Sequence, residues 1–384
     1  MKNIIFTLTL AGFIPALQAG EFIPADGPPI KDQYIVVFRD DMPVQAREGL
    51  LRALAGPGFR SVYQRVLNGG TVALSQQRAE ALARNPNVAY VEQDTVVWAS
   101  GSEIPTPSWG LDRIDQAKLP LDNTYHYTRI GKAVTAYVID TGIRYDHVDF
   151  DGRAHFGFDS LGGDGSDCNG HGTHVSGTLG GRHHGVAKSV ELVAVRVLGC
   201  SGSGTVSGVI SGIDWVTADH QDTRKTPAVA NMSLGGGMST ALDTAVTQSI
   251  RSGVTYAIAA GNSNKDACLS SPARVSESGA LTVGATTSTD ARAAYSNYGK
   301  CLDLFAPGSS ITSTWNTGLT ATNTISGTSM ATPHVAGVAA LYLEDHMLAT
   351  AATVRNAVVA AATRAVVKSA GRNSPNLLLY SLLP

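Results

Sequence analysis

The feature that most constrains the fold is a series of short, almost wholly apolar segments that alternates with Gly- and Ala-rich helical stretches from about residue 108 onward. Four segments have the composition of buried strands: residues 133–139, 192–198, 228–233 and 254–260. Helical stretches, for example 206–219 and 240–252, lie between them. Apolar strands that alternate with helices indicate a mainly parallel sheet covered on both faces, so we expect a three-layer α/β/α domain. In such sheets functional residues gather at the carboxyl ends of the strands.

The chain before this domain has its own pattern of segments. The order β-α-β-β-α-β is predicted at residues 34–38, 44–54, 61–74 (a strand pair that turns near Asn68), 76–84 and 88–97. This order is typical of a small α+β domain of the ferredoxin-like class. Residues 99–107, with their Gly, Ser and Pro, are interpreted as a linker.

The N-terminus has the pattern of an export signal. Lys2 is followed by an apolar stretch and by small residues near Ala19, so residues 1–19 are predicted to be a cleaved signal peptide. A short N-terminal anchor is the alternative, but the apolar stretch is too brief for it. No later apolar run predicts a membrane span, and a net charge of −2 gives no reason to expect binding to nucleic acid or to an anionic membrane.

Four cysteines, Cys168, Cys200, Cys268 and Cys301, agree with export, because disulfides persist in oxidising compartments. Four cysteines allow three pairings. Pairing in chain order closes two loops of similar length, each of which stabilises the fold by roughly 3–4 kcal/mol through chain entropy. Free buried thiols are the alternative, and they are less common in exported proteins.

Three residues with the chemistry of nucleophilic catalysis stand at predicted element ends. Asp140 ends the strand at 133–139, His171 begins a Gly-interrupted helix, and Ser329 begins a long helix in which Pro333 is tolerated only near the start. Singly, they resemble a turn acid, a core histidine and a helix N-cap. A serine hydroxyl, however, needs an imidazole to take its proton, and the imidazole needs a carboxylate to fix its tautomer. Together the three predict a catalytic set.

A fourth residue completes this prediction. Asn262 follows the strand at 254–260, where an asparagine is usually a turn residue. Its side-chain amide and the backbone N–H of Ser329 can donate hydrogen bonds to the negative charge that develops on a carbonyl oxygen under attack.

Several motifs resemble those of the subtilisin-like serine peptidases, and within them the proteinase K and aqualysin group. They are Val-Ile-Asp-Thr-Gly around Asp140, Asn-Gly-His-Gly-Thr-His around His171 and Gly-Thr-Ser-Met-Ala-Thr-Pro around Ser329, in the chain order of that family. The resemblance runs from about residue 109 to 383. It implies that His171 is the catalytic histidine, that His174 is structural and that Asn262 is the oxyanion donor.

The resemblance also assigns binding segments and disulfides. Two segments are expected to hold an extended substrate by backbone pairing, and a third to line the pocket for the residue before the scissile bond. In order, these are Gly202, Ser203 and Gly204, then Ser233, Leu234 and Gly235, then Ala259, Ala260 and Gly261. Small apolar walls imply a broad preference for apolar or aromatic side chains. The implied disulfides are Cys168–Cys200 and Cys268–Cys301.

Residues 32–97 resemble the inhibitor-type propeptide of this family, which assists folding and blocks the cleft until it is cut off. The resemblance therefore implies a signal peptide (1–19), a propeptide (20–101) and a peptidase domain (102–384), with the cut between residues 98 and 103. We expect a secreted, monomeric serine endopeptidase of proteins and peptides, made as a self-processing zymogen, that acts through an acyl-enzyme without a catalytic cofactor.

Calcium is the expected structural cofactor. Asp112, Asp115, Gln116 and Asp122 place oxygen ligands suited to Ca²⁺ in one short segment, although a solvated acidic turn is the alternative. By the resemblance, Asp303 is a ligand of a second ion, together with carbonyls of residues 271–283, a loop that is two residues longer than usual. Asp159, Asp164 and Asp167 are candidate ligands of a third ion.

Two other classes of function remain to be weighed. Cys168, His171 and His174 have a spacing that zinc ligands can adopt, which predicts a zinc enzyme. That interpretation leaves Ser329 and Asn262 unexplained. A non-catalytic binding module that uses the same cleft is the second alternative, but none of the catalytic groups is missing.

Overall fold

The computed structural model describes residues 20–25, 29–39, 43–63, 68–95 and 101–383. They form two compact units that divide between Trp98 and Ala99. The predicted signal peptide and the first part of the predicted processing region lie outside the described residues. Within those residues, no helix is long and apolar enough to cross a membrane.

The smaller unit confirms the predicted β-α-β-β-α-β order. Its elements are β1 (Glu21–Ile23), β2 (Pro29–Phe38), α1 (Val44–Ala55), β3 (Phe59–Val62), β4 (Gly69–Ala73), α2 (Gln76–Ala83) and β5 (Val88–Thr95). The strands form one sheet in the order β1-β5-β2-β4-β3. Strand β1, which the sequence did not predict, adds to the edge parallel to β5. Val36, Leu51 and Val72 are fully buried between the sheet and the two helices.

The larger unit is built on a sheet of nine strands in the order β17-β18-β14-β13-β12-β11-β8-β10-β9. All neighbours in it are parallel except β17 and β18. The strands of this sheet are β8 (Thr135–Asp140), β9 (Ala154–Asp159), β10 (Glu191–Arg196), β11 (Ala228–Met232), β12 (Thr255–Ala259), β13 (Ala280–Thr286), β14 (Leu304–Pro307), β17 (Thr363–Arg364) and β18 (Leu377–Leu378). Two small antiparallel pairs join β6 (Gly101–Glu103) to β7 (Tyr125–Tyr127) and β15 (Ile311–Thr314) to β16 (Thr322–Ile325).

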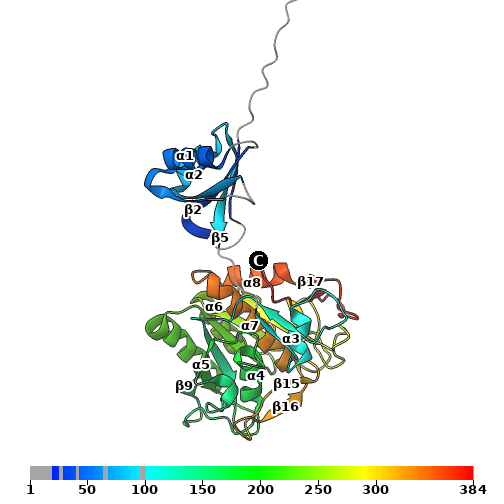
Figure 1. Cartoon of the computed structure of the whole chain (residues 1–384). Helices are drawn as coiled ribbons and strands as arrows, with labels where there is room; N and C mark the ends of the chain where they lie inside the picture. Colours follow the sequence, from blue (N-terminus) through cyan, green and yellow to red (C-terminus); the bar gives the residue numbers. More distant parts are fainter. Residues whose placement is uncertain (1–19, 26–28, 40–42, 64–67, 96–100, 384) are drawn as a thin grey trace, which may run out of the picture. The chain divides into compact units, whose positions relative to one another are not determined.

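Helices cover both faces of this sheet, as predicted (Figure 1). The helices are α3 (Trp109–Ile114), α4 (His171–Gly180), α5 (Val206–Ala218), α6 (Thr240–Arg251), α7 (Thr328–Asp345) and α8 (Ala351–Ala361). Successive residues of β8 point to opposite faces. Val138 packs in the cluster that contains α4, α7 and α8, whereas Ile139 packs in the cluster with α5 and α6. The three-layer α/β/α prediction is therefore confirmed.

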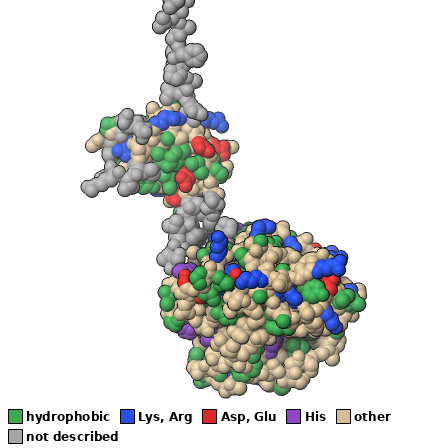
Figure 2. All heavy atoms as spheres, turned by 90° about the vertical axis from the view of Figure 1, so that its right-hand side faces the viewer, with side chains coloured by type: hydrophobic (Ala, Val, Ile, Leu, Met, Phe, Trp, Pro, Cys, Tyr) green, Lys and Arg blue, Asp and Glu red, His purple; other side chains and the backbone are tan. Residues whose placement is uncertain are grey.

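The four predicted strands and the helices at 206–219 and 240–252 are confirmed with shifts of one or two residues at their ends. Strands β9, β13 and β14 and helix α8 were not predicted from the sequence. On the face of the larger unit that Figure 2 shows, Lys and Arg side chains lie scattered among polar and backbone atoms.

Candidate active site

Asp140 and His171 form a hydrogen-bonded pair at the carboxyl end of the sheet. Asp140 is the last residue of strand β8 and is fully buried, and His171 is the first residue of α4. The Nδ1 atom of His171 lies 2.8 Å from Oδ1 of Asp140, and the backbone N–H of Thr141 donates to the same oxygen. The imidazole is 26 % exposed, so its other nitrogen can meet a substrate. The pair has the geometry in which a carboxylate fixes the tautomer of a general base.

The two histidines of the His-Gly-Thr-His motif differ in their electrostatics. Burial lowers the pKa of His171, but the negative charge of Asp140 and its hydrogen bond outweigh that effect, and the pKa is raised overall. Burial lowers the pKa of His174 to about 3, and its Nε2 lies 3.1 Å from the carbonyl oxygen of Ile311. His174 is therefore a neutral core residue. The zinc interpretation is wrong, because Cys168 is bonded to Cys200.

Ser329 is the second residue of α7, where the sequence predicted it. Pro333 has no N–H, so it cannot donate to the carbonyl of Ser329 four residues earlier. The hydroxyl of Ser233 donates to that carbonyl instead, at 2.8 Å. In return, the hydroxyl of Ser329 donates to the carbonyl of Ser233, at 3.1 Å. The side chain of Ser233 thus supports the first turn of α7, a role that the sequence did not indicate.

Asn262 lies beyond the end of β12 and is oriented by the residue before Ser329. Its Oδ1 accepts hydrogen bonds from the N–H of Thr328 at 2.8 Å and from the Thr328 hydroxyl at 2.9 Å. Because Oδ1 is bound by Thr328, the N–H groups of the Asn262 amide are available to donate hydrogen bonds to a substrate.

A cleft of about 510 Å³ contains His171, Ser329 and Asn262. The structure brings the first two predicted binding segments to this cleft, since all six of their residues line it. A smaller pocket of about 240 Å³ lies beside it and is lined by Ala259, Ala260 and Gly261 together with Asn262 and Ser329. The predicted residues therefore converge. Four apolar residues that were not predicted as site residues from the sequence also line the cleft: Leu198, Val206, Val209 and Leu242.

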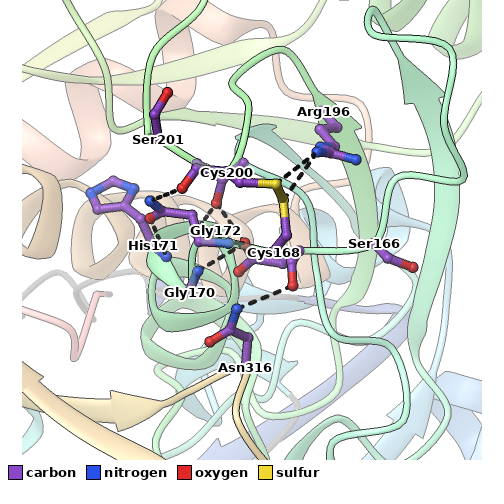
Figure 3. Close-up of a disulfide and its surroundings, with 12 residues drawn as sticks. Ser166, Cys168, Gly170, His171, Gly172, Arg196, Cys200, Ser201 and Asn316 are labelled. Atoms are coloured by element: carbon purple, nitrogen blue, oxygen red, sulfur yellow. Dashed lines mark hydrogen bonds between the residues drawn. A yellow bond between two sulfur atoms is a disulfide. The ribbon is translucent and has the colours of Figure 1, made fainter.

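Both expected disulfides are present, Cys168–Cys200 and Cys268–Cys301. Figure 3 shows the first of them beside Gly170, His171 and Gly172, with Arg196 reaching toward its sulfur atoms. The side-chain amide of Asn169 donates to the carbonyl of Cys200 at 2.9 Å. This bridge therefore joins the turn before His171 to the segment that continues into Gly202.

The acidic residues expected to bind calcium already accept hydrogen bonds from the protein. Asp112 accepts from the N–H groups of Asp122 and Asn123, and Asp115 accepts from His126. Gln116 donates its amide to the carbonyls of Lys118 and Pro120. Among the described residues, no three His, Cys, Asp or Glu side chains converge as a preformed metal site.

The other two expected calcium groups have protein partners in place of a metal. Arg355 forms an ion pair with Oδ1 of Asp303, and the N–H of Thr282 donates to Oδ2 at 2.7 Å. A guanidinium therefore supplies the positive charge at Asp303, which does not favour a calcium ion there. Asp159 pairs with Arg196, and Asp164 accepts from the N–H of Ser166. The Asp167 carboxylate accepts hydrogen bonds from residues of the 169–173 turn and from the Thr141 hydroxyl.

A model of the subtilase family matches residues 131–377 of this chain. The chain belongs to the subtilase family. A second model, of the I9 peptidase inhibitors, matches residues 33–99. The subtilase is 53% identical over 388 residues to an extracellular serine proteinase of Thermus sp. (strain Rt41A), with 95% of this chain and 91% of the relative covered. It is 48% identical over 389 residues to alkaline serine exoprotease A of Vibrio alginolyticus, with 95% and 71% covered.

A solved structure agrees with the fold. The subtilase matches the crystal structure of a cold adapted subtilisin-like serine proteinase with a TM-score of 0.68 and 57% sequence identity, over 71% of this chain and 98% of that one. The subtilase is therefore a serine endopeptidase with a subtilisin-like fold, preceded by an inhibitor-type propeptide domain.

Proposed function

We propose that the subtilase is a secreted endopeptidase in which Ser329 is the nucleophile, His171 the general base and Asp140 the residue that orients the base. The observation that carries this proposal is the convergence of the Asp140–His171 pair, Ser329 and Asn262 on one cleft. For attack, the Ser329 hydroxyl turns from the carbonyl of Ser233 toward Nε2 of His171. Catalytic hydrogen bonds of this kind often form only when substrate is bound.

The reaction then follows from the positions of these groups. Oγ of Ser329 attacks the peptide carbonyl carbon while its proton passes to Nε2 of His171, and Asp140 stabilises the imidazolium. The amide of Asn262 and the N–H of Ser329 bind the oxyanion. His171 next protonates the leaving amine, which leaves an acyl ester on Ser329. Water, activated by His171, hydrolyses this ester and restores the enzyme.

For specificity, we propose that an extended substrate pairs with the backbone of residues 202–204 and 233–235. The residue before the scissile bond enters the pocket at Ala259, Ala260 and Gly261. Because these walls carry no large or charged side chain, a range of apolar and aromatic side chains fits there.

For synthesis, we propose a signal peptide at 1–19, a propeptide at 20–101 that inhibits its own peptidase, and a mature, monomeric domain at 102–384. Export is supported by the relative named an extracellular serine proteinase and by the two disulfides. The cut is placed between residues 98 and 103. Strand β6 lies within this region and pairs with β7, and the carboxylate of Glu103 contacts the buried Lys188. These contacts hold Ser102 and Glu103, the first residues after the proposed cut, on the peptidase domain.

Calcium at Asp112, Asp115, Gln116 and Asp122 remains part of the proposal. Burial raises the pKa of Asp112, and the negative charge of Asp122 adds to this. A hard cation would relieve that repulsion. A calcium ion bound there would serve the fold and take no part in peptide hydrolysis.

The deciding experiment compares the secreted products of the wild type and of Ser329→Ala by intact mass and N-terminal sequencing. We expect the wild type to lose its propeptide and Ser329→Ala to retain it. Phenylmethylsulfonyl fluoride should abolish the activity of the mature enzyme, and phenanthroline should not. Normal self-processing of Ser329→Ala would refute the assignment of the nucleophile.

A further inference from the structure

We propose that Asp167 is a positioning residue for the catalytic pair, because its single carboxylate fastens the strand end that carries Asp140 to the helix start that carries His171. This inference rests on the proposed roles of Asp140 and His171. Asp167 contacts neither the substrate cleft nor Ser329, so any effect it has on catalysis passes through the other two residues.

Five donors converge on the carboxylate of Asp167. Its Oδ1 accepts from the N–H groups of Asn169 and Gly170 and from the hydroxyl of Thr141, each at 2.9 Å. Its Oδ2 accepts from the N–H of Thr173 at 2.9 Å and from the Thr173 hydroxyl at 2.6 Å. Bonds from residues 169 to 173 fix the backbone on both sides of the catalytic histidine.

Thr141 carries the connection to the other member of the pair. It follows Asp140 directly and is fully buried. Its N–H donates to Oδ1 of Asp140, the oxygen that also meets His171. Its hydroxyl donates to Asp167 and accepts from the N–H of Gly172 at 2.8 Å. The strand end and the helix start are therefore tied at Thr141 and Asp167, independently of the bond between Asp140 and His171.

The turn that contains Asp167 is itself anchored on two sides. Cys168 is bonded to Cys200, and the side chain of Asn316 donates to the backbone carbonyl of Asp167 at 3.1 Å. Figure 3 shows Asn316 and the disulfide on different sides of this turn. Because the carboxylate is attached to an immobilised backbone, it can hold the groups that it binds in one arrangement.

Asp167 also places a second negative charge near the imidazole. The groups whose charge acts on His171 are Asp140 and Asp167, which raise its pKa, and the neighbouring His174 is neutral. Loss of the Asp167 charge should therefore lower the pKa of His171. The base must be neutral to accept a proton, so the acid limb of the activity profile should move to lower pH.

The test compares Asp167→Asn with Asp164→Asn, a control that removes a carboxylate three residues earlier. The Asp164 side chain accepts from the N–H of Ser166 and contacts none of the catalytic groups. For Asp167→Asn we expect kcat on peptide substrates to fall on the order of 10-fold to 100-fold, since misplacement of catalytic groups has effects of this size, with KM little changed. The acid limb of kcat/KM should shift to lower pH, and Asp164→Asn should match the wild type.

A second pair of variants separates geometry from charge. Thr141→Val removes the hydroxyl but leaves the Asp167 charge, so kcat should fall without a shift of the acid limb, whereas Thr141→Ser should behave as the wild type. If Asp167→Asn is processed too slowly to yield mature enzyme, the self-cleavage rate of the precursor reports the same chemical step and should fall by a similar factor. Wild-type kcat and pH profile in Asp167→Asn, or equal rates in Thr141→Val and Thr141→Ser, would overturn the inference. These results are distinct from those of Ser329→Ala, which tests the nucleophile alone.

Discussion

At the scale of single residues, the orientation of Asn262 depends on a residue 66 positions later in the chain. Thr328 is buried and donates twice to the side-chain oxygen of Asn262, which lies at the exposed rim of the cleft. Thr328 also directly precedes Ser329. The proposed nucleophile and the proposed oxyanion donor thus share one support, and their separation is set by the first turn of α7.

Replacing Asn262 tests the oxyanion donor. We expect Asn262→Ala to lower kcat by about 10²–10³-fold with little change in KM, as for removal of one oxyanion-hole donor in a subtilisin. Thr328→Val, which frees the amide to rotate, should lower kcat less, and Thr328→Ser should not lower it. Steady-state kinetics with active-site titration measures these effects. An unchanged kcat in Asn262→Ala would show that the oxyanion is bound elsewhere.

At the scale of elements, the two disulfides form a matched pair. They join residues 32 and 33 positions apart, so the chain-entropy model gives them nearly equal stabilising effects of roughly 3–4 kcal/mol. Their surroundings differ. Cys168 and Cys200 join the turn before α4 to the segment after β10. Asn169 and Gly202, within two positions of these cysteines, line the cleft, whereas no residue within two positions of Cys268 or Cys301 does.

Removing each disulfide separates stability from catalysis. The double variants Cys168→Ala with Cys200→Ala and Cys268→Ala with Cys301→Ala should lower the melting temperature by similar amounts, as measured calorimetrically on inhibitor-treated enzyme. Only the first should also raise KM and lower kcat, because Asn169 and Gly202 lose their fixed spacing. Equal kinetic constants in the two double variants, below their melting temperatures, would contradict a role of Cys168–Cys200 in substrate binding.

At the scale of the whole molecule, the negative charges of two largely buried carboxylates, Asp303 and Asp112, are compensated in different ways. Asp303 has Arg355 from helix α8 as its partner, which joins segments 52 residues apart. Asp112 has a carboxylate, Asp122, as its neighbour and backbone N–H groups as its donors. At Asp303 the protein itself supplies the compensating positive charge, through Arg355. At Asp112 a bound cation can supply it.

Chelation should distinguish these two groups. We expect EDTA to lower the melting temperature of the inhibitor-treated wild type, and Asp112→Asn to reduce this response strongly. Arg355→Gln should destabilise the protein on the order of 1–3 kcal/mol, because the half-buried ion pair is lost, but it should retain the wild-type response to EDTA. Calcium titration followed by differential scanning calorimetry measures both effects. A full calcium response in Asp112→Asn would exclude the proposed site.

The sequence by itself determined the class of fold and the main site residues. Strands β8, β10, β11 and β12 are predictable because they are buried on both faces, which requires continuous apolar runs. Asp140 is predictable because a parallel sheet gathers the ends of its strands at one edge, and His171 and Ser329 because each stands at the start of a helix. That inference needs only the local position of each residue at the end of an element.

The tertiary structure decided what depends on neighbours distant in the sequence. Strand β9 has a weak local pattern and β14 has only 4 residues, and their pairing with β10 and β13 stabilises them. The hydroxyl of Ser233 replaces the donor that Pro333 lacks, and Arg355 replaces a metal ion at Asp303. Asp167 is a polar loop residue in the sequence, yet in the fold it is bonded on both sides of the catalytic pair. Hydrogen bonds and ion pairs form between the groups that the fold brings close together. The distance between two residues far apart in the sequence cannot be inferred from the periodic pattern of either segment.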